Sequence, residues 1–273
     1  MKTSSLFFSN NQFFFILSSS FFLIILTVCC TCIIIATIED DVKCLQGIKT
    51  SLTDPLGFLS TWNFTNTSTP GFFCSFRGVR CDMIDKELCL SGIDLAYMNV
   101  SGKIPESLKY CNNLRYLILS SNNLSGSIPP QLCTWLPYLS RLYLSSNRLT
   151  GSISPLLNCS FLKDLYLSDN MLSGSTPPQL CTWLPYLSRL DLSSNRFAGS
   201  ISPLLNCSFL KDLYLRDNML SGSTPPQLCT WLPYLSRLDL SSNRFTGSIS
   251  PLLNCSFLKD LFLRDNMLSG QIA

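Results

Sequence analysis

Residues 131–178 read QLCTWLPYLSRLYLSSNRLTGSISPLLNCSFLKDLYLSDNMLSGSTPP, and this stretch decides the fold because the chain repeats it almost unchanged. Residues 179–226 are a second copy, and residues 227–273 begin a third. Repetition at a fixed period predicts one elongated domain in which each unit packs on its neighbours. The first two copies differ at four positions: Tyr143 becomes Asp191, Leu149 becomes Phe197, Thr150 becomes Ala198 and Ser168 becomes Arg216.

Each 48-residue unit contains two shorter repeats of the pattern LxLxxNxLxG, such as residues 117–126. Leucines at alternate positions place their side chains on one face of a short strand, and no single turn can bury that face without its neighbours. The asparagine is expected to bond backbone groups where the chain leaves the strand. An earlier copy has Met98 at this position. The asparagines are spaced alternately 25 and 23 residues apart: Asn122, Asn147, Asn170, Asn195, Asn218, Asn243 and Asn266.

This is the pattern of the leucine-rich repeat. Gly126 is followed by Ser-Ile-Pro, which resembles the plant-type repeat, whose LxGxIP segment forms a second short strand and twists the stack. The resemblance implies an α/β solenoid, a plant-type leucine-rich-repeat superhelix with a parallel sheet on the concave face and a helical N-terminal cap. Because serine replaces the proline at Ser154 and Ser202, a less regular second sheet is expected.

The chain divides into three segments. Residues 1–36 begin with a positively charged Lys2 and continue into a long apolar run. This pattern predicts a secretory signal peptide or, if the segment is not cleaved, a membrane anchor. Residues 37–89 are predicted to form the cap, with a helix starting near Asp40. Residues 90–273 hold about eight repeats, the last incomplete at Ala273, and this end suggests a truncated product, a fragment or pairing through the open end.

Three stretches are similar to a narrower family. Residues 39–47, 105–111 and 133–139 look like the short ectodomain of plant receptor kinases that often have an inactive kinase, over roughly residues 37–178. The resemblance implies binding to co-receptor kinases of the somatic-embryogenesis type, in defence or hormone signalling. This chain departs from that family because it shows no kinase.

The cap resembles that of plant leucine-rich-repeat receptors in its C-x6-C pair. In a secreted chain, this likeness implies a disulfide between Cys74 and Cys81.

Outward-facing residues of the strands are expected to form columns on the concave face, since adjacent strands lie about 4.8 Å apart. Exposed tyrosines beside arginines are typical of protein interfaces, whereas alternating Arg and Asp can instead satisfy each other in a surface ladder. The sequence leaves both interpretations open. The candidate binding residues are Tyr116, Arg141, Asp164, Arg189, Asp212, Arg237 and Asp260 in one column, Ile118, Tyr143, Tyr166, Asp191, Tyr214, Asp239 and Phe262 in the next, and Arg216 beside them.

Cysteines also recur in the repeats. Equivalent sites two turns apart would be about 10 Å distant, too far for a disulfide. Bonding between neighbouring turns is left open, and buried thiols are expected. Eleven cysteines remain after removal of the leader, so at least one is unpaired within a monomer. The six recurring cysteines are Cys133, Cys159, Cys181, Cys207, Cys229 and Cys255.

Seven N-x-S/T sequons fit a secreted glycoprotein. The acceptors are Asn63, Asn66, Asn99, Asn123, Asn158, Asn206 and Asn254.

The amino-acid composition excludes several classes of function. The chain has no His, which excludes Ser-His-Asp and Cys-His catalysis and His-ligated metals, and we expect neither a metal nor another cofactor. A formal charge of +3 gives no reason to expect nucleic acid. We therefore predict an extracellular binding module for a protein or peptide, secreted or on the outer face of the plasma membrane. It would touch the membrane only through an uncleaved N-terminal segment.

Three other interpretations compete with this prediction. An enzyme with paired carboxylates, such as a wall hydrolase, is disfavoured because the acids recur on an open ladder beside arginines. A secreted inhibitor of cell-wall-degrading enzymes would share the plant-type repeat, but such proteins usually close with a C-terminal cysteine cap that this sequence lacks. The abrupt end also fits a truncated gene copy without a retained function.

Overall fold

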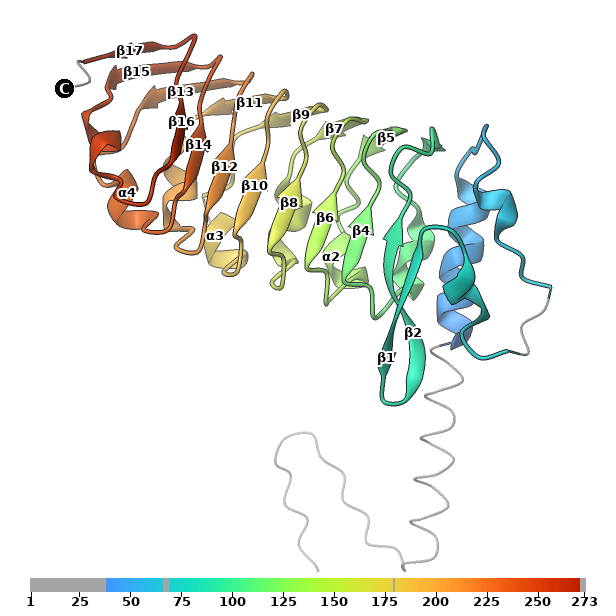
Figure 1. Ribbon diagram of the computed structural model, residues 1–273. Helices are drawn as coiled ribbons and strands as arrows, with labels where there is room; N and C mark the ends of the chain where they lie inside the picture. Colours follow the sequence, from blue (N-terminus) through green and yellow to red (C-terminus); the bar gives the residue numbers. More distant parts are fainter. Residues whose placement is uncertain (1–37, 66–68, 179, 271–273) are drawn as a thin grey trace, which may run out of the picture.

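The computed structural model describes residues 38–65, 69–178 and 180–270. The predicted leader, residues 1–36, lies outside them. The repeats stack into an elongated, curved solenoid with the cap at one end (Figure 1). Within the described part of the chain, no helix is both long enough and apolar enough to cross a membrane.

Nine strands line the concave face in the order β1-β2-β4-β6-β8-β10-β12-β14-β16. β1 and β2 form an antiparallel hairpin that the sequence analysis did not predict, and all later neighbours are parallel. Leu117 pairs with Leu142 and Leu142 with Leu165, so the predicted register of the leucines is confirmed. The strands are β1 (Val79–Ile84), β2 (Glu87–Asp94), β4 (Tyr116–Ile118), β6 (Arg141–Tyr143), β8 (Asp164–Tyr166), β10 (Arg189–Asp191), β12 (Asp212–Tyr214), β14 (Arg237–Asp239) and β16 (Asp260–Phe262).

A second sheet of eight parallel strands runs along the upper edge of the stack in Figure 1, in the order β17-β15-β13-β11-β9-β7-β5-β3. As expected, this sheet is less regular than the concave one: its strands are two to five residues long and pair over two or three, whereas the concave strands from β4 to β16 are all three residues long. Ser154 and Ser202 lie outside the strands, each as the first residue of a 3-10 helix. The strands are β3 (Ser101–Gly102), β5 (Asn123–Ser127), β7 (Arg148–Gly151), β9 (Met171–Gly174), β11 (Arg196–Gly199), β13 (Met219–Ser223), β15 (Arg244–Ser248) and β17 (Met267–Ser269).

Short helices connect the two sheets, and their type alternates with the 25- and 23-residue spacing. The LCTW segments form α-helical turns and the SPLLN segments form 3-10 helices, so each 48-residue unit contains one of each. The elements are η3 (Glu106–Tyr110), α2 (Leu132–Trp135), η4 (Ser154–Asn158), α3 (Leu180–Trp183), η5 (Ser202–Asn206), α4 (Leu228–Trp231) and η6 (Ser250–Asn254).

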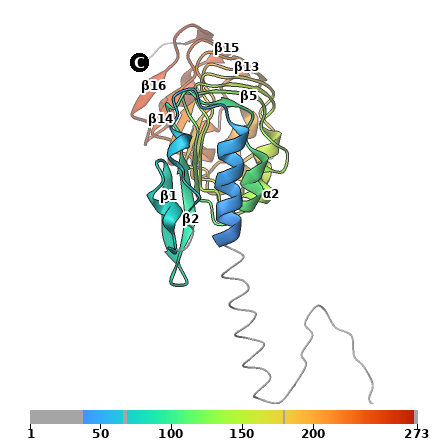
Figure 2. The ribbon, with the colours of Figure 1, turned by 90° about the vertical axis from the view of Figure 1, so that its right-hand side faces the viewer.

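The cap closes the N-terminal end of the hydrophobic core. The chain is helical through residues 38–51, and η1 (Leu59–Thr61) and η2 (Phe72–Ser75) follow. Figure 2 shows the helix beside the β1–β2 hairpin at this end of the stack. Gly47 packs against Ser107 so closely that a Cβ at Gly47 would collide with it.

A ladder of asparagine amides confirms the role predicted for these residues. The Asn122 Oδ1 accepts a hydrogen bond of 3.0 Å from the Val100 N–H, and its Nδ2 donates to the carbonyls of Leu95 and Leu119 at 2.8 and 3.0 Å. The other six asparagines repeat these contacts in their own turns. Each amide therefore joins its own turn to the preceding one.

The described residues form five disulfides, three of which join neighbouring turns, and the interpretation of the repeat cysteines as buried thiols was wrong. Cys133 bonds Cys159 across neighbouring turns, where α2 lies beside η4, and the Cα atoms are 4.8 Å apart. The equivalent pairs are Cys181–Cys207 and Cys229–Cys255. Cys44 joins the cap helix to Cys111 in the first repeat.

Candidate functional site

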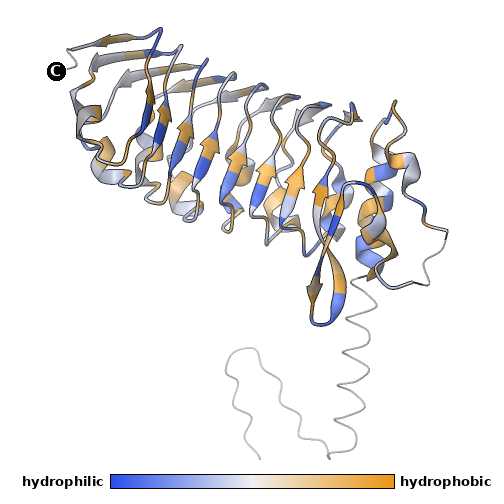
Figure 3. Cartoon of the chain, viewed as in Figure 1, coloured by the Kyte–Doolittle hydropathy of each residue, from blue (hydrophilic) through white to orange (hydrophobic). Residues whose placement is uncertain are grey.

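The concave face brings together the two columns expected from the sequence. Residues of the first column pair in register, as Tyr116 with Arg141 and Arg141 with Asp164, and this continues to Asp260. The second column is in register from Ile118 to Phe262. Hydrophilic and hydrophobic positions therefore lie side by side on these strands (Figure 3). The strand of the first repeat adds Gly92 and Asp94, which the sequence analysis did not include.

Asp164 is the most buried charged residue in the first column. Its side chain is only 4% exposed, and Arg189 donates two hydrogen bonds to it, from Nε at 2.7 Å and from Nη2 at 2.9 Å. Arg141 approaches the same carboxylate from the other side at 3.2 Å. These hydrogen bonds to Asp164 hold the pKa of the Arg189 guanidinium above its usual range. One carboxylate thus shares two arginines, and both arginines keep an exposed side.

The pairing loosens toward the C-terminal turns. Arg237 lies 3.0 Å from Asp260 and 3.8 Å from Asp212, measured from nitrogen to carboxylate oxygen, and its side chain is half-exposed. Exposed ion pairs of this kind contribute about 0–1 kcal/mol each. The ladder therefore adds little stability, and its charged groups can exchange partners with a bound surface.

Aromatic side chains lie on three consecutive strands at the N-terminal end of the face, β4, β6 and β8. The rings of Tyr143 and Tyr166 meet edge to face with centroids 4.8 Å apart, and the Arg141 guanidinium lies 5.0 Å from the Tyr116 centroid. Partial burial raises the pKa of both Tyr143 and Tyr166, so both hydroxyls are neutral at physiological pH. Neutral hydroxyls beside rigid rings are suited to hydrogen bonding at a protein interface.

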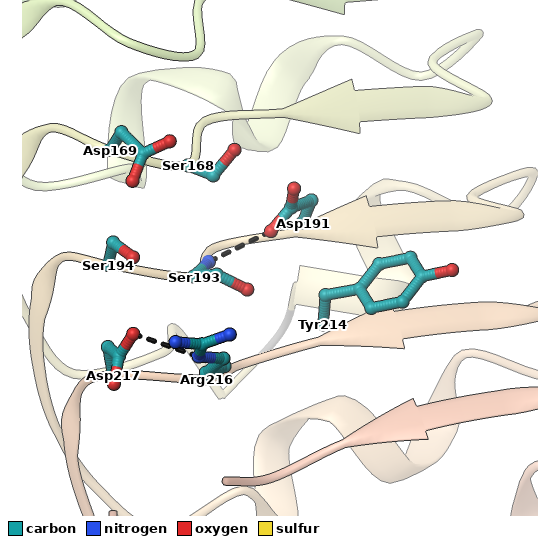
Figure 4. Close-up of a pocket in the computed structure, with 8 residues that line it drawn as sticks. All are labelled: Ser168, Asp169, Asp191, Ser193, Ser194, Tyr214, Arg216 and Asp217. Carbon is teal, nitrogen blue, oxygen red and sulfur yellow. Dashed lines mark hydrogen bonds and ion pairs between the residues drawn. The ribbon is translucent and has the colours of Figure 1, made fainter. Parts of the chain in front are cut away.

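An open polar hollow of about 440 Å³ lies where the chain leaves β8, β10 and β12. Figure 4 shows its lining residues. Arg216 lies here, beyond the columns, with its Nε 3.0 Å from Asp217 Oδ2, while Asp191 accepts a hydrogen bond from the Ser193 N–H. The residues that line the hollow are Ser168, Asp169, Asp191, Ser193, Ser194, Tyr214, Arg216 and Asp217.

The remaining predicted residues lie away from the concave strands. Cys74 and Cys81 form a disulfide within the cap. Asn63, Asn99 and Asn158 are exposed, and the Asn123 amide donates a 2.6 Å hydrogen bond to Asn99. Asn206 and Asn254 end η5 and η6, and Asn66 is outside the described residues.

Two features escaped the sequence analysis. One is Asp41, whose buried carboxylate accepts a 2.8 Å hydrogen bond from the Leu90 N–H at the junction of cap and repeats. The other is a row of half-exposed aromatic rings before the concave strands. The sequence does contain a pattern that indicates this row: Tyr or Phe recurs three residues before each Arg or Asp of the first column, from Arg141 onward.

Family profiles match most of the described chain. The profile described as "Leucine Rich Repeat" matches residues 113–135, 138–160, 161–183, 186–208, 209–231 and 234–256. The chain belongs to the leucine-rich repeat family. Residues 38–82 of this leucine-rich repeat protein match the profile described as "Leucine rich repeat N-terminal domain".

The relatives are receptor kinases and the solved ectodomain of one of them. Over 105 residues the leucine-rich repeat chain is 53% identical to the inactive LRR receptor-like serine/threonine-protein kinase BIR2 of Arabidopsis thaliana, a stretch covering 38% of this chain and 17% of BIR2. The BIR2 ectodomain structure is 45% identical with a TM-score of 0.60, and the match covers 65% of this chain and 92% of that one. A chain of the Arabidopsis BIR3–SERK2 complex is 47% identical with a TM-score of 0.60, covering 66% and 94%.

These matches define the class of the protein. It is a receptor-like leucine-rich-repeat module that is secreted or lies on the extracellular face of the plasma membrane. The chain spans only about a sixth of the length of the full curated relatives.

Proposed function

We propose that this module acts by binding the ectodomain of a co-receptor kinase through its concave face, without catalysis. The observation that carries the proposal is the cluster of Tyr143, Tyr166 and the Arg141–Asp164–Arg189 group, which presents rings and charges in one fixed arrangement. Interface energy is typically concentrated in a few such aromatic and arginine residues. The likeness to a chain of the BIR3–SERK2 complex supports a partner of the SERK type.

The charge arrangement fits reversible recognition. The arginines of the ladder are held by Asp164 yet remain 42–47% exposed, so a partner's carboxylates can approach them without first breaking a buried pair. Pre-ordered arginines also lose less side-chain entropy when they bind. We propose that glycans on the exposed sequons confine the partner to this face.

The test is binding of the secreted chain to the SERK2 ectodomain by isothermal titration calorimetry. The variant Tyr143→Asp, Tyr166→Ser removes both rings. Aspartate at position 143 copies Asp191 and Asp239, which occupy this position in the later units, so the strand will tolerate it. The affinity of the variant should fall at least about tenfold if the rings are central to the interface. Lys211→Ser, outside the concave columns, is the matched control and should bind as the wild type does.

Two results would reject the proposal. One is the absence of SERK2 binding by the folded wild-type chain, and the other is undiminished binding by the double tyrosine variant.

A further inference from the structure

A second surface lies on the edge where the chain enters the concave strands, along the lower side of the solenoid in Figure 1. Six consecutive turns place an aromatic ring there, and each ring is between 49% and 59% exposed. The centroids of Tyr138 and Phe161 are 6.1 Å apart, and those of Tyr234 and Phe257 are 6.4 Å apart. We call this the aromatic row: Tyr138, Phe161, Tyr186, Phe209, Tyr234 and Phe257.

A basic row runs beside the rings. The residue two positions after each ring is alternately serine and lysine, and backbone hydrogen bonds of 2.8 Å link Lys163 to Ser140, Ser188 to Lys163 and Lys211 to Ser188. The lysines therefore lie two turns apart, at about 10 Å from one to the next. The basic row consists of three exposed lysines, Lys163, Lys211 and Lys259.

The edge carries positive charge that the protein does not neutralise. The salt bridges described in the repeats from β6 onward join arginines to aspartates and include none of the three lysines. The aspartates of the copies belong to the concave strands and to the loops that follow them. An anionic ligand on the edge would thus meet lysines without displacing an existing partner.

The near-identity of the copies indicates what kind of ligand fits. A folded protein presents a different side chain to each turn, so an interface with one would favour turns that differ from one another. Here the rings and lysines recur with the same spacing in every copy. Identical sites at a fixed spacing are best matched by a ligand that itself repeats, because each added unit then contributes the same contact.

We propose that this edge binds an acidic polysaccharide, a polyuronate chain that lies along the solenoid axis. Each pyranose ring has an apolar C–H face that can pack on a ring of the aromatic row, and each uronate carries a carboxylate that can pair with a lysine of the basic row. The serines at the alternate turns offer hydroxyls to the remaining sugar oxygens. This site is separate from the concave face and requires no co-receptor.

The experiment measures binding of galacturonate oligomers to the full secreted chain by calorimetry at low ionic strength, with neutral cello-oligosaccharides of equal length as the comparison. The wild type should bind the acidic oligomers, more tightly as they lengthen and more weakly as salt is added. In the variant Lys163→Ser, Lys211→Ser, Lys259→Ser the affinity should fall at least about tenfold, since several ion pairs act together. Serine at these positions copies the alternate turns, so the fold is retained.

A matched control removes the same charge elsewhere. Arg148→Ser, Arg196→Ser, Arg244→Ser deletes three exposed, periodic arginines from the second sheet and should leave the affinity within about twofold. The ring variant Phe161→Ser, Phe209→Ser, Phe257→Ser should weaken binding as strongly as the lysine variant. The proposal is overturned if the wild type binds no galacturonate oligomer, if the arginine control loses as much affinity as the lysine variant, or if neutral oligomers bind equally well.

Discussion

The side-chain amide of the repeated asparagine holds neighbouring turns at a fixed spacing. Asn170 accepts a 2.9 Å hydrogen bond from the Leu149 N–H and donates to the carbonyls of Leu144 and Leu167 at 3.0 and 3.2 Å. Asn170→Ala would leave these half-buried backbone groups without partners, which should lower the free energy of unfolding by about 1–3 kcal/mol. Urea denaturation measures the change. The same replacement at exposed Asn112 should have almost no effect, and equal losses at both sites would contradict the ladder.

A second prediction concerns the buried carboxyl of Asp41. Burial raises its pKa from 3.8 to about 7, with Asp40 adding to the shift and the hydrogen bond from Leu90 opposing it. The folded state therefore binds a proton that the unfolded state has released between pH 4 and 7, so this group makes the protein less stable as the pH rises through that window. Asp41→Asn should remove this part of the pH dependence, of the order of a few kcal/mol.

The measurement compares urea midpoints at pH 5 and pH 7.5. Glu39→Gln, which removes an exposed carboxylate of the same helix that does not contribute to the shift of Asp41, is the control and should keep the wild-type slope. A wild-type stability that rises between these pH values would show that other groups outweigh Asp41.

These residues show where sequence reasoning succeeds. The role of Asn122 and the alternation of Arg189 with Asp164 follow from spacing alone, because a stacked solenoid converts sequence period directly into neighbours. Asp41 could not be identified this way. Its burial depends on the β1–β2 hairpin and the cap helix meeting around it, and neither contact is periodic.

The elements show the same division. The alternate leucines predicted the concave strands and their register, but the short helices on the other side differ between α-helix and 3-10 helix with the 25- and 23-residue spacing. This difference in local geometry brings Cys181 in α3 within 4.7 Å of Cys207 after η5, measured between Cα atoms. The spacing of the cysteines allows a bond between neighbouring turns, but the distance between two such cysteines depends on helix geometry that the repeat pattern does not determine.

Removing one of these bonds should reveal how strongly it holds two turns together. The double variant Cys181→Ser, Cys207→Ser should lose about 2–4 kcal/mol of unfolding free energy, because the disulfide restricts the unfolded chain across a sequence separation of 26 residues. Cys89→Ser changes the cysteine that forms no disulfide among the described residues and serves as the control. Denaturation under non-reducing conditions makes the comparison, and a double variant as stable as the Cys89 variant would show that the bond contributes nothing.

At the scale of the whole molecule, the duplicated units act as interchangeable blocks. Each 48-residue unit contains one α-helical turn, one 3-10 helix and both cysteines of its disulfide. The junctions Pro178–Gln179 and Pro226–Gln227 have the same flanking sequence on both sides. Stability in such stacks is approximately a sum of units and their nearest-neighbour contacts, so one block can be removed without creating a new interface.

Deleting residues 179–226 should therefore give a shorter solenoid that still folds. The chain would keep residues 37–178, and Arg237 would take the place of its counterpart Arg189 beside Asp164, so SERK2 affinity should be unchanged. Galacturonate affinity should fall because two rings of the aromatic row and one lysine are lost. Calorimetry with both probes separates the two surfaces. Deleting 179–202 instead is the control: it leaves Cys207 without Cys181 and breaks the alternation of helices, so this variant should be clearly less stable. If the 48-residue deletion were the less stable of the two, the units would not be independent blocks.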